Sequence, residues 1–268
     1  MLSDTLIRDL AQRLENAEND RRNIGLFSIE FPEITIDDAY AVQRAWFEMK
    51  MLAGRKLIGH KIGLTSKAMQ SAVGIDEPDY GFLLDNMLFR DGAEIPKGHF
   101  IAPRIEVELA FILAKPLSGP NCTVFDVLNA TDYICPALEI LDNRLHRSDP
   151  ETKRGRTVKD TISDNASNAG IVLGGRPFKP TDPVDLRWVS ALCYRNSSLE
   201  ESGVAAAVLN NPVNGVAWLA NKLAPFGEVL QPGEIILSGS FVRPIEAYPG
   251  STIFADYGPL GTISCHFG

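Results

Sequence analysis

The sequence lacks the cysteine and histidine patterns of common metal and redox proteins. Its 268 residues include four cysteines and four histidines, and no two cysteines have the CxxC spacing. Neither a zinc ribbon nor a thioredoxin-like redox pair is indicated, and the histidines form no HExxH or HxH pair. We expect four reduced thiols, as in a cytosolic protein, at Cys122, Cys135, Cys193 and Cys265.

Long apolar runs are also missing. No run approaches the roughly 18 residues that a membrane helix needs. The amphipathic N-terminus has neither the basic start nor the apolar stretch of a secretory signal. Hydrophobic residues make up 45% of the chain and charged residues 22%, a balance typical of globular proteins. These observations predict a cytoplasmic protein without a membrane partner.

An excess of basic residues is absent as well. The formal net charge is −8 and the pI is about 5.1. Because phosphate binding needs a basic face, we expect no nucleic-acid partner. The chain also has no GxGxxG or Walker motif, which argues against a nucleotide cofactor. An anionic small substrate is compatible with this charge if a side chain or a metal supplies a local cation.

Helical signals dominate the first hundred residues. Apolar residues recur at helical spacing over 6–14, after Ser3 or Asp4 as the N-cap. A second helix is predicted over 36–52, with Thr35 as its cap. A short strand is predicted over 57–64, leading into a loop.

From Arg104 onward, apolar segments alternate with Gly, Pro, Asn and Asp turns, a pattern that predicts strands. One helix interrupts them, capped by Asn211 with Pro212 in its first turn. We therefore predict an α+β protein, with a helical N-terminal region over 1–100 and a mixed β-rich domain over 101–268. The predicted strands cover 105–115, 133–141, 170–173, 186–195, 234–237, 252–256 and 262–267.

The stretch RIEVELAFILA, residues 104–114, has the apolar character of a buried strand and yet carries two carboxylates. Residues two apart on a strand face the same way, so Glu106 and Glu108 share one face. Such alternation is the normal pattern of a half-exposed strand, which is the simpler interpretation. The alternation ends at Ala110, however, and the segment that follows is apolar on both faces, as in a buried strand.

A second apolar segment, 133–141, carries a single charge, Glu139. A buried carboxylate costs several kcal/mol unless it is neutralised, paired or metal-bound. One interpretation is a salt bridge from Glu139 to Arg104 or Arg144. The other is that three carboxylates converge on Mg²⁺ or Mn²⁺, which prefer oxygen ligands.

Six stretches, distributed over essentially the whole chain, resemble the 2-keto-4-pentenoate hydratase family of the fumarylacetoacetate hydrolase superfamily. RIEVELAFIL is similar to the metal motif of that superfamily. The other stretches are GHKIGLTSKAMQ (59–70), EPDYGFLLD (77–85), DYICPALEILDNR (132–144), DTISDNASNAGIVLGG (160–175) and ILSGSFVRP (236–244). The resemblance implies a helical N-terminal part followed by a folded-over mixed β-sheet domain of the superfamily's C-terminal type.

The resemblance also implies which residues bind the metal. Glu106, Glu108 and Glu139 match the positions that hold one divalent cation, normally Mg²⁺, with Mn²⁺ as the alternative.

Four more residues are implied by the same resemblance. Lys61 in HKIG and Asp79 in PDYG match positions with acid–base and substrate roles, although the sequence does not say which residue is the acid. Ser163 in TISDN and Ser240 in SGSF lie in segments that border the site and are candidate substrate contacts. Without the resemblance, Lys61 would be a surface lysine and Asp79 an ordinary turn residue.

The reaction that the resemblance implies is hydration. Hydratases of aromatic meta-cleavage catabolism add water to a 2-oxo-4-enoate and produce a 4-hydroxy-2-oxo acid, with the metal as Lewis acid. The quoted stretches match most closely those members that act on the seven-carbon diacid of homoprotocatechuate degradation. The monoacid 2-oxopent-4-enoate stays open as a substrate, and so does decarboxylation of 2-oxo-3-hexenedioate on the same metal site. An acylpyruvate hydrolase and a non-catalytic partner protein are more distant alternatives.

A diacid needs a cation for its far carboxylate, and the sequence does not choose among Arg22, Arg144, Arg156 and Arg243. The resemblance further implies a homo-oligomer, such as a decamer of two stacked pentamers.

Overall fold

The computed structural model describes the backbone of residues 1–268 and the side chains of all of them except 72 and 73. Its largest element is a mixed sheet with the strand order β2-β1-β10-β5-β6-β7-β3, in which β11 also pairs with β5. The strands are β1 (Leu57–Gly63), β2 (Asp79–Leu84), β3 (Leu88–Arg90), β5 (Arg104–Leu113), β6 (Thr131–Leu141), β7 (Asn168–Leu173), β10 (Ile235–Leu237) and β11 (Ile245–Glu246).

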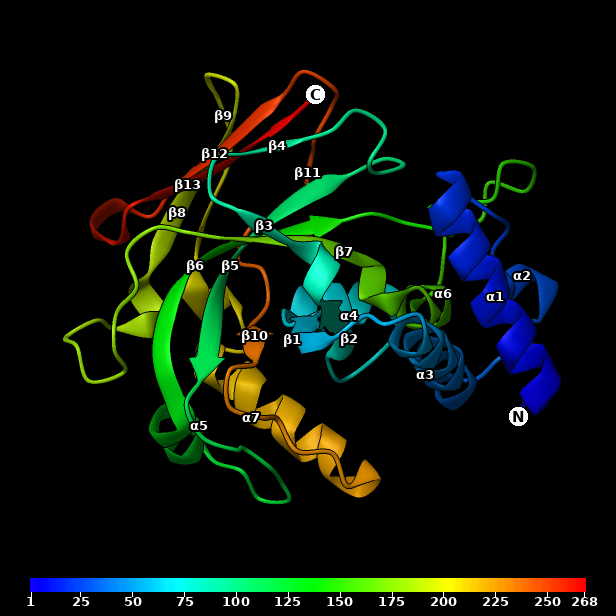
Figure 1. The fold of residues 1–268 in the computed structure, drawn as a ribbon, viewed down its shortest axis with the longest axis horizontal. Helices are drawn as coiled ribbons and strands as arrows, with labels where there is room; N and C mark the ends of the chain where they lie inside the picture. The colour runs from blue at the N-terminus through cyan, green and yellow to red at the C-terminus, as the bar shows by residue number, and fades with distance from the viewer.

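A second sheet has the order β4-β13-β12-β8-β9 and lies at the upper left of Figure 1. One face of β5, including Val107 and Leu109, shares a hydrophobic core with residues of this sheet such as Ile253 and Ile263. The opposite face of β5 carries the two glutamates. The strands of the second sheet are β4 (Ala93–Ile95), β8 (Ser190–Arg195), β9 (Ser198–Val204), β12 (Thr252–Asp256) and β13 (Thr262–Phe267).

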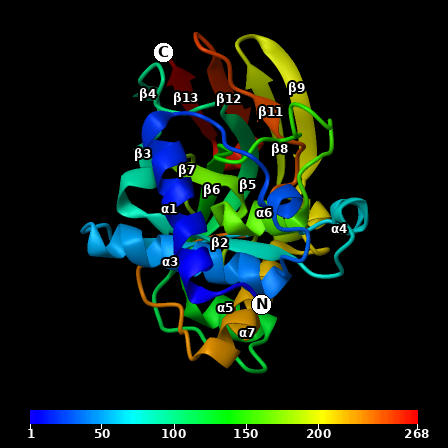
Figure 2. The same cartoon turned by 90° about the vertical axis from the view of Figure 1, so that its right-hand side faces the viewer.

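Helices cover the large sheet at two places. The N-terminal helices α1 and α3 pack against each other and lie in front of the strands in Figure 2. Helices α5 and α7 pack together at the bottom of both views. The helices are α1 (Asp4–Asp20), α2 (Phe27–Glu30), α3 (Ile36–Leu52), α4 (Lys67–Val73), α5 (Val124–Ala130), α6 (Val158–Ser163) and α7 (Pro212–Leu223).

The predicted α+β class is confirmed, and the predicted caps explain where three helices begin. Ser3 accepts a hydrogen bond from the Leu6 N–H at the start of α1. Thr35 forms a capping box at the start of α3, and Asn211 caps α7. These short polar side chains satisfy N–H groups that the first turn of a helix leaves without a partner.

Several elements were not predicted, among them β2, β9 and the short helices α4, α5 and α6. Strand β9 has the sequence SLEESGV, in which polar residues face both ways, so hydrophobic alternation gives no signal. It forms because it continues from β8 as an antiparallel neighbour at the edge of the sheet. The predicted strand 186–195 begins later, at Ser190, after a 3₁₀ turn.

The predicted division at residue 100 stays a prediction. Strands β1 to β4 lie before it, and three of them, β1, β3 and β4, pair with strands from the second part of the chain. The four cysteines are free and buried. Among the helices that the structure describes, none has the length and apolar character that crossing a bilayer requires.

Arg144 joins the N-terminal helices to the large sheet. Its guanidinium carbon lies 5.0 Å from the centre of the Trp46 ring of α3. Its Nε donates to Asp164 Oδ1 at 2.6 Å, and Nη2 donates to the backbone carbonyls of Asp164 and Asn168 at 2.9 and 3.0 Å. A buried ion pair with this many hydrogen bonds is costly to break, because either partner alone would be an uncompensated buried charge.

We therefore expect Arg144→Met to lower the free energy of unfolding by about 3–5 kcal/mol, because buried Asp164 would lose its nearer cation and keep only Arg156, at 3.5 Å. Urea denaturation followed by circular dichroism measures the change. Arg22→Met is the matched control, because Arg22 pairs with Asp20 at the surface and its removal should leave the midpoint unchanged. Equal midpoints for the two variants would contradict the role given to Arg144.

Candidate metal and catalytic site

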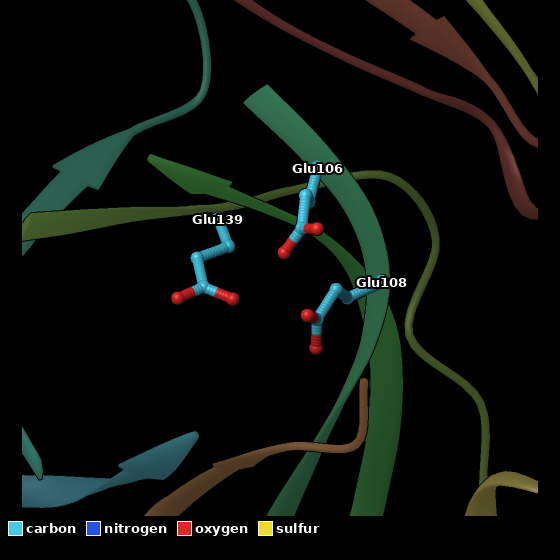
Figure 3. Close-up of side chains that lie close together, drawn as sticks. All are labelled: Glu106, Glu108 and Glu139. Atoms are coloured by element: carbon cyan, nitrogen blue, oxygen red, sulfur yellow. The ribbon is translucent and has the colours of Figure 1, made fainter. Parts of the chain in front are cut away.

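Three glutamates converge where β5 and β6 pair. Glu106 and Glu108 share one face of β5, and Glu106 lies directly opposite Glu139 of β6 in the antiparallel register. Figure 3 shows the three side chains directed into one space. One carboxylate oxygen from each lies within 4.8 Å of the others. The pleat and the register therefore assemble a cluster of oxygen donors from two strands.

The cluster is buried, and its charges repel one another. Glu108 and Glu139 are fully buried, and Glu106 is partly buried. Burial, followed by the charge of Glu139, raises the pKa of Glu106 to about 8. Burial and the neighbouring glutamates also raise the pKa of Glu108 well above its ordinary value. Three carboxylates in this position need a nearby cation to be ionised together.

In Glu108 and in Glu139, one carboxylate oxygen accepts a hydrogen bond and the other has no partner. Glu108 Oε2 accepts from the Gly239 N–H at 2.8 Å, and Glu139 Oε1 accepts from Asn168 Nδ2 at 2.9 Å. Glu108 Oε1 and Glu139 Oε2 have no hydrogen-bond partner among the described residues. Buried oxygens without partners are uncommon and point to a missing ligand. The residues therefore fit a divalent cation that prefers oxygen donors, such as Mg²⁺ or Mn²⁺.

Lys61 is the cation that contacts the cluster. Its Nζ lies 3.1 Å from Glu139 Oε1 and donates to the Ala166 carbonyl at 3.1 Å. The expected salt bridge of Glu139 to Arg104 or Arg144 is absent, and Lys61 takes that place within the described chain. Lys61 is 3% exposed, so its interpretation as a surface lysine is wrong. Burial lowers its pKa, but Glu139 and the other carboxylates outweigh burial and leave the pKa above its ordinary value.

Asp79 faces the same space as Lys61. It begins β2, opposite Gly63 of β1, and is only 1% exposed, so it is not an ordinary turn residue. Neither of its carboxylate oxygens has a hydrogen-bond partner in the part of the chain that the structure describes. A Cβ on Gly63 would lie 2.2 Å from Asp79 Oδ1 and 3.1 Å from Lys61 Nζ. A glycine at position 63 is therefore required, because any larger residue would fill the space that the Asp79 and Lys61 side chains occupy.

A strained turn holds the Lys61 ammonium. Asn165, Ala166 and Ser167 have positive φ angles of 51°, 48° and 64°. Non-glycine residues adopt this region at a cost of roughly 1–2 kcal/mol each. The Asn165 side chain fixes the turn to β2, because Nδ2 donates to the Phe82 carbonyl and Oδ1 accepts from the Phe82 N–H. The turn directs the Ala166 carbonyl at Lys61.

The substrate contacts predicted for the two serines stay a prediction. Ser163, at the end of α6, is fully buried, and its Oγ has no hydrogen-bond partner among residues whose side chains are described. The Ser240 hydroxyl lies 2.8 Å from the Val242 carbonyl oxygen, and so it contacts the backbone of its own loop. The neighbouring Gly239 N–H is the group that contacts the carboxylates.

The residues that sequence analysis did not identify are Asn165, Asn168 and Gly63. A signal existed for the turn, because the run DNASN contains two asparagines, and asparagine tolerates positive φ better than most residues. The contact between Asn168 and Glu139 had no such signal, since it depends on how β6 and β7 pair.

The carboxylate cluster generates a prediction about stability. In EDTA at neutral pH, Glu106→Gln should unfold at a temperature several degrees above that of the wild type. Folding raises the pKa of the Glu106 carboxyl to about 8, so the wild type must bind a proton as it folds, and the amide avoids that cost. Added Mg²⁺ should raise the melting temperature of the wild type and have little effect on the variant. Differential scanning calorimetry in EDTA and in Mg²⁺ measures both. Equal Mg²⁺ responses would show that Glu106 is not a ligand.

The chain is similar to known enzymes over almost its whole length. No protein-family model matches the sequence. The chain is 65% identical over 258 residues to 2-oxo-hept-4-ene-1,7-dioate hydratase of Escherichia coli. The aligned residues cover 96% of each protein. It is 36% identical over 259 residues to 2-keto-4-pentenoate hydratase of Paraburkholderia xenovorans, covering 97% of this chain and 94% of that one.

Solved structures show the same fold. 4-Oxalocrotonate decarboxylase of Pseudomonas putida G7, complexed with magnesium and adipate, superposes with a TM-score of 0.93 at 36% identity, over 100% of this chain and 99% of that one. A putative fumarylacetoacetate hydrolase family protein of Yersinia pestis matches in fold alone, with a TM-score of 0.56 at 14% identity, over 78% of this chain and 92% of that one. This chain belongs to the 2-keto-4-pentenoate hydratase family.

Proposed function

We propose that this protein is a divalent-metal-dependent hydratase of aromatic meta-cleavage catabolism. Its substrate is 2-oxo-hept-4-ene-1,7-dioate, and its product is a 4-hydroxy-2-oxo diacid. The observation that carries the proposal is a buried cluster of three carboxylates beside Lys61 and Asp79. The cluster lies in a chain 65% identical to a hydratase named for this substrate.

Glu106, Glu108 and Glu139 would hold the metal, which we propose to be Mg²⁺. Their available oxygens, Glu108 Oε1 and Glu139 Oε2, support this role. When bound, a divalent cation supplies Lewis acidity that stabilises negative charge developing on the 2-oxo group of the substrate. The related decarboxylase has been solved with magnesium and with calcium, which supports a divalent cation in this fold.

Lys61 and Asp79 would transfer the protons. The dienol form of the substrate first loses the proton of its 2-hydroxyl group and gains one at C5, which leaves a 2-oxo group conjugated with a double bond between C3 and C4. Water then bonds to C4 and loses one proton, while C3 gains one proton. Each transfer needs a positioned acid or base. Both side chains are buried beside the carboxylates, and Gly63 keeps the space between them free of a side chain.

Hydration and decarboxylation are the two reactions to separate. Decarboxylation is the second candidate, because the structure with a TM-score of 0.93 belongs to a decarboxylase. Release of CO₂ from a 2-oxo-3-enedioate and addition of water to a 2-oxo-4-enoate both build negative charge on the 2-oxo group. The carboxylates alone therefore do not distinguish the two reactions.

The assay that tests the proposal uses the dienol of the seven-carbon diacid, with Mg²⁺ and then with EDTA, and identifies products by NMR. We expect a 4-hydroxy-2-oxo diacid in Mg²⁺, no CO₂, and no turnover in EDTA. The parallel assay uses 2-oxo-3-hexenedioate, because only in the six-carbon diacid can loss of the far carboxylate place charge on the 2-oxo group. CO₂ from that compound, without hydration of the seven-carbon diacid, would establish the decarboxylase and contradict the hydratase.

Asp79→Asn should lower kcat by about 10²–10⁴-fold, because the amide keeps the shape of the carboxylate but does not exchange protons at neutral pH. The Mg²⁺-dependent rise in melting temperature should persist, since Asp79 is not a proposed ligand. Asp85→Asn is the control: Asp85 lies just beyond β2, and its side chain accepts from the Lys56 N–H at the surface. A kcat within a few fold of wild type for Asp79→Asn would exclude Asp79 from proton transfer.

The proposal also includes a cytoplasmic location and a homo-oligomer, as the family resemblance implies. Exposed apolar side chains on and beside β8 and β9 support an oligomer, because they offer surface for a second copy. They include Trp188, Leu192 and Leu199.

A further inference from the structure

We propose that Arg104 and Arg156 bind the second carboxylate of a dicarboxylic substrate and so determine selectivity for the diacid over the monoacid. The inference rests on the proposed function, because it concerns the same site. Arg156 is one of the four arginines that the sequence left open, and Arg104 is added to them by the structure.

Arg104 lies on the same face of β5 as the carboxylate cluster. Residues two apart on a strand share a face and are separated by about 6.7 Å along it. Arg104 is therefore one step beyond Glu106, at the end of the cluster away from Glu108. The first carboxylate and the 2-oxo group of the substrate would bind at the metal that the three glutamates would hold. The remaining carbons would then extend toward Arg104 or toward Lys61.

Arg104 has no committed acidic partner. It forms no ion pair within 4.0 Å in the described chain, and its buried Nε lacks a hydrogen-bond acceptor. The acid opposite it, Glu246 of β11, is held instead by Arg147, whose two terminal nitrogens lie 2.6 and 3.4 Å from its carboxylate oxygens. A partly buried guanidinium without an acid is an anion-binding group with free donors.

Arg156 reaches the same end from another part of the chain. Its Nη1 donates to Asn143 Oδ1 at 2.6 Å, and Asn143 follows β6 two residues after Leu141, the residue paired with Arg104. Its Nη2 lies 3.5 Å from Asp164 Oδ2, but Asp164 is already held by Arg144. The Arg156 side chain is 13% exposed, and its Nε has no acceptor among the described residues.

The charges of the two arginines act on each other and on the site. Burial lowers the pKa of Arg104 below its ordinary value, and Arg147 and Arg156 lower it further. Burial raises the pKa of Asp79, and Lys61 and Arg156 oppose that rise. Arg156 is therefore within electrostatic range of both Arg104 and Asp79. Arg104 has no acid within ion-pair distance, and Arg156 shares Asp164 with Arg144, so an anion between the two arginines would reduce their repulsion.

The other arginines do not fit this role. Arg22 and Arg243 have side chains 68% and 84% exposed and pair with Asp20 and Glu201. Arg144 is only 1% exposed, and its Nε and Nη2 donate to Asp164 and to the Asn168 carbonyl.

The test measures binding, so it does not depend on turnover. Isothermal titration calorimetry of the Mg²⁺-loaded protein with 2-oxoheptanedioate and with 2-oxopentanoate gives the ratio of the two Kd values. We expect the wild type to prefer the diacid, and Arg104→Met and Arg156→Met each to reduce that preference by roughly 30-fold or more. Arg104→Lys should lose less, because it keeps the charge but not the planar fork. Arg243→Met is the matched control and should keep the wild-type ratio.

A wild type without preference for the diacid would overturn the inference, and so would a preference that survives both methionine substitutions. The outcome is separable from the reaction itself. An Arg104-dependent preference together with CO₂ release in the NMR assay would retain this inference and contradict the hydratase. If the diacid is hydrated but the ratio of the two Kd values is unchanged in both variants, the hydratase is retained and this inference is contradicted.

Discussion

Mutual repulsion among three buried carboxylates is the constraint on which the rest of this structure depends. The β5–β6 register places Glu106 opposite Glu139, and the pleat adds Glu108 on the same face. In a low-dielectric interior this arrangement is unfavourable unless cations compensate it. Lys61 supplies one charge, and a divalent metal would supply the remainder. The neighbouring elements position these charges: β1 carries Lys61, and the turn at 165–167 accepts a hydrogen bond from its ammonium group.

The backbone near the carboxylate cluster is locally strained, and the strain positions the charges that compensate the cluster. Three successive residues at 165–167 have positive φ, and their turn directs a backbone carbonyl at Lys61. Gly63 lacks a side chain where any Cβ would collide with Asp79. Such features lower stability and persist only where the surrounding packing determines them. The buried pair of Arg144 and Asp164 next to the turn contributes to that packing, because it ties α3 to the chain that forms the turn.

Charge is distributed unequally around the carboxylates. Lys61 and Asp79 lie on the side of β1 and β2, where we place the proton transfers. Arg104 and Arg156 lie beyond Glu106; the Nε of each lacks a hydrogen-bond acceptor among the described residues, and Arg156 shares Asp164 with Arg144. In our proposal, this arrangement separates chemistry from recognition of the substrate's far end. Related hydratases and decarboxylases are named for different substrates.

The sequence by itself determined the local features. Caps at Ser3, Thr35 and Asn211 could be predicted because capping depends on a few neighbouring residues. The shared face of Glu106 and Glu108 followed from the two-residue period of a strand. Resemblance to the family then indicated Glu139, Lys61 and Asp79, without saying how they meet.

Tertiary structure decided what depends on pairing between distant segments. Contacts of Glu139 with Lys61 and Asn168, the edge strand β9, and the lack of acidic partners for Arg104 all arise from the order in which strands lie side by side. A single sequence does not encode that order in any local pattern. It results from the burial of one continuous core by segments far apart in the chain.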